Sequence, residues 1–185
     1  MASLILTVIG PDRPGLVRAL AHAVAAHGGS WLESRMARLA GQFAGIVLVE
    51  GPDAMLADLH ALESEGLRIV VRTGATASHA APSPFAPSGQ RLAVEVVGND
   101  RPGIVRDVAR VLAAHGANIE ELTTGVVSGS FSGETLFKAT AFVRAPDEAA
   151  VAAIRSGLEF LGNEMMVDIQ AEADRQPGGD PSPRG

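Results

Sequence analysis

A short motif that occurs twice carries the residues with the clearest chemical potential: GPDRPG at residues 10–15 and GNDRPG at residues 98–103. Each copy follows an apolar run and precedes a helical pattern, which indicates a strand-to-helix turn. The free N–H groups at the start of a helix attract a carboxylate, and a nearby aspartate can receive an ammonium group. This combination suits a free amino acid. Capping of the helices by Asp12 and Asp100 is an equally good explanation of the same residues.

No other group of residues predicts a reaction. The chain has no cysteine, which excludes disulfides, thiolate metal sites and a cysteine nucleophile. His27 and His115 each precede a glycine at the expected end of a helix, and neither has a second histidine or a carboxylate four residues further on. Nucleophile, phosphate-loop and dinucleotide motifs are absent from the sequence. We therefore expect no catalytic residue, no cofactor and no metal site.

The amino-acid composition limits the classes of molecule that this chain is expected to bind. The net charge is −6, the pI is about 5.3 and aromatic residues make up 4% of the 185 residues. An acidic chain with few aromatic side chains is a poor binder of nucleic acid. No apolar run reaches the ~18–20 residues that a membrane-spanning helix needs, and the first residues do not resemble a targeting segment. We expect a cytoplasmic protein that contacts neither nucleic acid nor membrane.

The motif belongs to a longer internal repeat. Segments that begin at Leu4 and Leu92 align without gaps, with equivalent residues 88 positions apart, and about half of their residues are identical. The repeat predicts two small domains, at residues 1–73 and 91–172, instead of one large domain. A proline-rich linker is expected at 74–90 and a disordered polar tail at 173–185.

Each repeat has the pattern strand, helix, two strands, helix, strand. Strands are expected at 4–9, 31–39, 43–50, 67–72, 91–97, 118–127, 135–144 and 165–171, and helices at 14–27, 53–64, 102–115 and 147–161. At the motif itself, Gly10 and Gly98 are expected to supply unusual backbone geometry, and Pro14 falls in the first helical turn.

This order predicts an α+β, ferredoxin-like fold: a four-stranded antiparallel sheet with both helices on one face. A unit of this size has a marginal core and an uncovered sheet face. We therefore expect units to pair, within one chain or between chains, which favours a homo-oligomer such as a dimer. A crevice between paired units is a natural binding place for a small ligand.

The pattern G-x-D-R-P-G-[LI]-V, followed by a helix and by A-A-H-G, resembles the ACT domain family of ligand-binding regulatory modules. The resemblance covers nearly all of residues 4–172. The tandem arrangement is most similar to the glycine cleavage system transcriptional repressor group, which has two ACT domains and no other domain.

The resemblance implies that an amino acid binds where two ACT units meet, between the first strand–helix loop of one unit and the start of the second strand of its neighbour. Carried over to this sequence, the implied ligand-binding residues are Asp12, Arg13, Pro14, Gly15, Leu16, Val17 and Ser30 in the first unit, and Asp100, Arg101, Pro102, Gly103, Ile104, Val105 and Asn118 in the second. Asn118 begins the usual Asn-Ile pair of the family, whereas Ser30-Trp31 departs from it. The two crevices are therefore expected to differ.

These observations favour a non-enzymatic regulatory protein. It would bind a small amino acid, with glycine as one candidate, and modulate a protein partner in the transcriptional control of amino-acid metabolism. The alternative is a regulatory subunit of a separate metabolic enzyme, and a third interpretation is a dimerisation module that needs no ligand.

Overall fold

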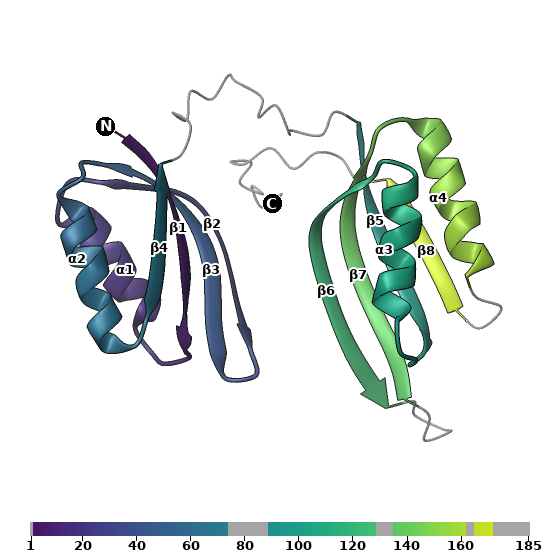
Figure 1. Cartoon of the computed structure of the whole chain (residues 1–185), viewed down its shortest axis with the longest axis horizontal. Coiled ribbons are helices and arrows are strands. Elements are labelled where there is room, and N and C mark those ends of the chain that lie inside the picture. Colours follow the sequence, from purple (N-terminus) through teal and green to yellow (C-terminus); the bar gives the residue numbers. More distant parts are fainter. Residues whose placement is uncertain (1, 74–88, 129–134, 162–164, 172–185) are drawn as a thin grey trace, which may run out of the picture. The chain divides into compact units, whose positions relative to one another are not determined.

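A computed structural model describes residues 2–73, 89–128, 135–161 and 165–171 (Figure 1). The chain divides into two compact units, Met1–Pro82 and Ser83–Gly185, each with its own hydrophobic core. Apart from residues 89 and 90, the expected linker lies outside the described residues, and so does the expected tail.

Both units have the predicted order of elements. Unit 1 comprises β1 (Ala2–Pro11), α1 (Leu16–Ala25), β2 (Ser30–Leu39), β3 (Gln42–Gly51), α2 (Met55–Ala61), the short 3₁₀ helix η1 (Leu62–Glu65) and β4 (Arg68–Thr73). Unit 2 comprises β5 (Gln90–Asn99), α3 (Ile104–Ala114), β6 (Asn118–Ser128), β7 (Thr135–Ala145), α4 (Glu148–Phe160) and β8 (Met165–Ala171). The sheets are antiparallel, in the orders β2-β3-β1-β4 and β6-β7-β5-β8. The predicted α+β fold is confirmed.

Both helices of a unit cover the same face of its sheet (Figure 1). Alternate residues of a strand point to one face, and Leu4, Leu6 and Val8 of β1 are buried against Leu20 of α1 and Leu59 of α2. Each such side chain contributes roughly 1.5–3 kcal/mol when it leaves water. In unit 2 the corresponding core includes Leu92, Val94, Leu112, Ile154 and Leu158.

The opposite face of each sheet is uncovered within its unit. In unit 1 it presents Ile5, Ile9, Ile46 and Val70, which are between 37 and 55% exposed. In unit 2 the central strands carry an ion pair on this face, because Lys138 Nζ lies 2.7 Å from a carboxylate oxygen of Glu95. The central strands of the open face therefore carry aliphatic side chains in unit 1 and an ion pair in unit 2.

Three helices differ from the sequence pattern: α1 and α3 begin later than expected, at Leu16 and Ile104, and α2 ends earlier. Helix α1 begins at Leu16, so Pro14 precedes the helix instead of lying in its first turn. Helix α2 ends at Ala61 and continues as η1, which stops at Gly66 with a φ of +90°. The β2–β3 hairpin turns through Ala40 and Gly41, both with positive φ, as expected of a tight two-residue hairpin turn.

Candidate functional site

The chain enters the first helix of each unit through a glycine in the left-handed conformation. Gly15 has a φ of +94° and Gly103 a φ of +85°, a region that costs other residues roughly 1–2 kcal/mol. Gly10 and Gly98, where we expect this freedom, do not have positive φ. Gly10 is required for a different reason, because a Cβ there would lie 2.7 Å from the carbonyl oxygen of Gly66.

The aspartates of the two motifs do not cap the helices. Neither α1 nor α3 has a side-chain cap. A carboxylate oxygen of Asp12 lies 2.6 Å from Nε of Arg38, and the Asp12 N–H donates to the carbonyl of Gly41. The Asp100 N–H donates in the same way to the carbonyl of Thr135. The capping interpretation is therefore wrong, and the aspartates fasten the loop to the neighbouring hairpin instead.

The two motif arginines have different partners. Arg13 lies 2.7 Å from a carboxylate oxygen of Glu65 at the end of η1, and both side chains are about half exposed. Arg101 instead donates to Asp107 of α3 at 2.8 Å. Arg106 donates to the other oxygen of Asp107 through Nε and Nη2, at 3.2 and 3.1 Å. The hydrogen bonds from Arg101 and then Arg106 hold the pKa of the Asp107 carboxyl below its usual range.

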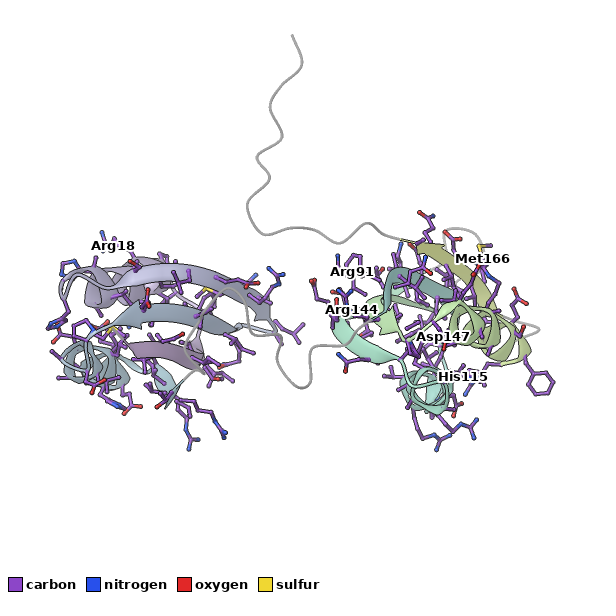
Figure 2. All side chains as sticks on the ribbon, turned by 90° about the horizontal axis from the view of Figure 1, so that it is seen from above. Arg18, Arg91, His115, Arg144, Asp147 and Met166 are labelled. Carbon is purple, nitrogen blue, oxygen red and sulfur yellow. The ribbon has the colours of Figure 1, made fainter. Side chains whose placement is uncertain are left out.

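A surface pocket of about 380 Å³ opens beside the motif of unit 1. It lies along α1 and reaches η1, and Arg18 projects from α1 at the surface of the unit (Figure 2). Its lining comprises Arg13, Pro14, Gly15, Leu16, Arg18, Ala19, His22 and Glu65. Four of the expected ligand-binding residues, at 13–16, thus line one concave surface, and Asp12 and Val17 do not.

In unit 2 the described pocket near the motif is of another kind. It lies between α3 and the sheet strands β5, β6 and β7, has room for only about 20 Å³, and is lined almost wholly by apolar side chains. Val105 is the single expected site residue in its lining. Asp100, Arg101, Pro102 and Gly103 are exposed, and Ile104 is buried in the core. This pocket is too small for an amino acid.

Ser30 and Asn118, at the starts of β2 and β6, lie far from the motif of their own unit. Ser30 is paired through Glu50 with Ser3 at the beginning of β1, whereas the motif follows the end of β1. The register places Asn118 in the same way at the opposite end of its sheet. Within a single unit the fold therefore does not bring the two halves of the expected site together.

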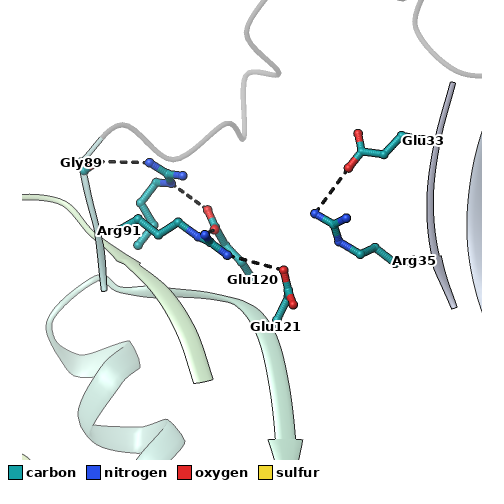
Figure 3. A network of polar contacts seen from close by, with 7 residues as sticks. Glu33, Arg35, Gly89, Arg91, Glu120 and Glu121 are labelled. Atoms are coloured by element: carbon teal, nitrogen blue, oxygen red, sulfur yellow. Dashed lines mark hydrogen bonds and ion pairs between the residues drawn. The ribbon is translucent and has the colours of Figure 1, made fainter. Parts of the chain in front are cut away.

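The starts of β2 and β6 have different polar surroundings. In unit 2, Glu120 accepts hydrogen bonds from Arg91 and Arg144, at 3.1 and 2.7 Å (Figure 3). The Arg91 guanidinium also stacks on the ring of Phe142 at 4.5 Å. In unit 1 the residue equivalent to Arg91 is Ser3, whose buried hydroxyl has no hydrogen-bond partner among the described residues.

Within residues 2–73, 89–128, 135–161 and 165–171, no group of three or more acidic or histidine side chains could hold a metal ion. No helix in this part of the chain is long and apolar enough to cross a bilayer. His27 lies 2.9 Å from a carboxylate oxygen of Asp58 on α2, a contact that the sequence did not reveal.

Comparisons with known proteins agree with this architecture. The family model of the ACT domain matches residues 2–72 and 90–172. The UPF0237 protein of Methanopyrus kandleri is 35% identical over 79 residues, which cover 43% of this chain and 82% of that protein. A crystal structure of an unknown protein from Galdieria sulphuraria has 30% sequence identity and a TM-score of 0.76, and the match covers 93% of this chain and 99% of that one.

The glycine cleavage system transcriptional repressor of Escherichia coli is a more distant relative. It is 29% identical over 122 residues, which cover 65% of this chain. The match spans 63% of the repressor, less than two thirds of its length. Because the family model covers both repeats and each repeat folds as βαββαβ, the chain belongs to the ACT domain family and carries two ACT domains in tandem.

Proposed function

We propose that this ACT-domain protein is a non-enzymatic regulator that binds a small amino acid and thereby changes its affinity for a protein partner. Two equivalent loops carry the proposal, one before α1 and one before α3. In each, a left-handed glycine leads into a helix that no side chain caps. Such a helix start offers N–H donors and a partial positive charge to a carboxylate.

The ligand is proposed to lie at a junction between two ACT units, of one chain or of two. The register supports this, because the motif and the start of the second strand lie at opposite ends of one sheet. Only the motif of one unit and the strand start of another can then touch the same small molecule. Asn118 offers an amide to such a ligand, whereas Ser30 offers a hydroxyl, so the two junctions would differ in affinity.

The partner is proposed to be a protein and not DNA. The net charge of −6 opposes contact with a phosphate backbone. The similarity to a glycine cleavage system transcriptional repressor supports a role in the transcriptional control of amino-acid metabolism and makes glycine the first ligand to test. If ligand and partner compete, each must weaken the binding of the other by the same factor.

Calorimetric titration of the full chain with each of the twenty amino acids tests the proposal. At least one is expected to bind at millimolar concentration or below. The Asn118→Ala variant is expected to weaken that binding about five- to thirtyfold, since a lost hydrogen bond to a ligand costs about 1–2 kcal/mol. Gln170→Ala, which removes an exposed amide from β8, is the control and should bind as the unmodified chain does. Failure of all twenty amino acids to bind would overturn the proposal.

A further inference from the structure

The two motifs can be compared residue by residue, because equivalent positions lie 88 apart. The arginine of the motif and the arginine on the first helical turn are present in both units, as Arg13 and Arg18 in unit 1 and Arg101 and Arg106 in unit 2. The next residue differs: it is Asp107 in unit 2 and Ala19 in unit 1. The pair of arginines is therefore shared, and the carboxylate is not.

In unit 2 both shared arginines, Arg101 and Arg106, bind the carboxylate of Asp107 in the same chain. Asp107 has a side chain only 12% exposed and receives both guanidinium groups, one on each carboxylate oxygen. Arg106 folds back over the left-handed glycine, with Nη2 3.0 Å from the position that a Cβ of Gly103 would take. Two guanidinium groups on one carboxylate form a complete ion-binding arrangement, and the chain itself supplies the anion.

In unit 1 the same arrangement lacks its anion. Ala19 has only a methyl group, and the pocket of about 380 Å³ lies beside it. Arg18 makes no ion pair or hydrogen bond with any residue that the structure describes, and Arg13 contacts Glu65 at the rim. Glu65 is the one acidic residue in a lining that contains two arginines and His22, so the lining carries an excess of positive charge. The start of α1 adds to it.

We infer that the pocket of unit 1, lined by Arg13, Arg18 and Ala19, binds the carboxylate group of a small acid, and that Asp107 is a built-in substitute for that carboxylate in unit 2. The volume lies within the range of small-molecule pockets, about 300–1,000 Å³. Arginine suits the role because its planar donor pair matches the two oxygens of a carboxylate.

This inference deepens the proposed function and rests on it, since it states which of the two loops takes the ligand and by which group. It predicts one such acid per chain. Its test uses succinate, a diacid that is not an amino acid, besides glycine. The inference and the proposed function can therefore fail separately.

The experiment is a calorimetric titration of the full chain with succinate, with glycine and with inorganic phosphate. Succinate is expected to bind at one site per chain. Ala19→Asp is expected to weaken this binding at least tenfold, because the new carboxylate occupies the arginines as Asp107 does in unit 2. Ala57→Asp, which adds the same charge at an exposed position of α2 outside the pocket lining, is the matched control and should change the affinity less than twofold.

The converse variant is Asp107→Ala, which removes the internal carboxylate from unit 2. It is expected to raise the number of succinate sites from one per chain to two. Circular dichroism checks that each variant is folded, and Arg18→Gln, at an exposed position, provides a second way to disable the first site.

Several results would overturn the inference. They are the absence of succinate binding, unchanged affinity in both Ala19→Asp and Arg18→Gln, or tighter binding of phosphate than of succinate. If an amino acid binds but is insensitive to both substitutions, the proposed function stands and the inference fails. If succinate behaves as expected but no amino acid binds, the inference stands and the proposed function fails.

Discussion

Arg13 and Glu65 meet at 2.7 Å across 52 positions of sequence, and their contact ties the loop before α1 to the turn before β4. Both side chains are nearly half exposed. Exposed pairs of this kind stabilise a fold by about 0.2–1 kcal/mol. The contact therefore matters less for folding than for the charge of the pocket, where Glu65 would compete for Arg13 with the external carboxylate that we propose.

Glu65→Gln is expected to increase the affinity of unit 1 for succinate about two- to fivefold, which corresponds to roughly 0.4–1 kcal/mol. Calorimetry measures the affinity, and urea unfolding should show a loss of less than about 1 kcal/mol in the free energy of unfolding. Glu159→Gln, at an exposed position of α4, serves as the control. Weaker binding in Glu65→Gln would contradict the expectation and would show that Glu65 holds Arg13 in place for the ligand.

The ion pairs of Asp107 predict a dependence of stability on acid pH. The folded pKa of Asp107 lies below its usual value of 3.8, so the folded state holds fewer protons than the unfolded state in this range. Stability from Asp107 is therefore fully present above the unfolded pKa and is lost as pH falls through the folded pKa.

Unfolding of the unmodified chain and of Asp107→Asn, followed from neutral pH to about pH 2, measures this effect. The two proteins should differ most in stability at neutral pH and converge at the acid end. A difference that stays constant over the whole range would show that the carboxylate charge of Asp107 contributes nothing.

Gly15→Ala is expected to lower the free energy of unfolding by about 1–2 kcal/mol, because a φ of +94° is strained for a residue with a Cβ. Gly125→Ala provides the opposite case. That glycine lies in β6 without positive φ, and a Cβ there would meet nothing within 4 Å. Its replacement should leave stability unchanged or raise it slightly. Equal losses in the two variants would exclude backbone strain as the cause.

The separate cores predict separate responses to core mutations. Leu6→Ala in unit 1 and Ile154→Ala in unit 2 each remove a fully buried side chain, and each should cost about 2–5 kcal/mol. Hydrogen exchange should show lost protection in the unit that carries the substitution and unchanged protection in the other. Loss of protection in both units from one substitution would contradict this.

The fold was predictable because its signals are local. The alternation of buried residues in β1 and the glycines that end its neighbouring elements depend on residues close in sequence. The internal repeat then presents the same strand and helix signals a second time in the sequence. The shortening of α2 was not predictable, because Leu62 keeps the helical spacing and only the 3₁₀ geometry of η1 distinguishes it.

The candidate site was predictable only in part. The motif indicated a loop at residues 12–17, but the contacts that define its charge come from elsewhere in the fold. Glu65 approaches Arg13 from η1, where the chain returns after α2, and Asp58 approaches His27 from α2 itself. The contrast between Ala19 and Asp107 was visible in the aligned repeats, and its meaning required the distances to Arg101 and Arg106.

Asp107 lies on the same helix as Arg106, so dilution of the solution does not remove this carboxylate from its arginine partners. A carboxylate attached to the same chain has an effective concentration at its partners that the surrounding solution cannot change. The occupancy of the two arginines of unit 2 is therefore fixed by the polypeptide. The occupancy of the unit 1 pocket would instead follow the concentration of the external acid. If the pocket of unit 1 binds an acid as we infer, one loop of the chain would keep a constant occupancy and the other would report a changing one.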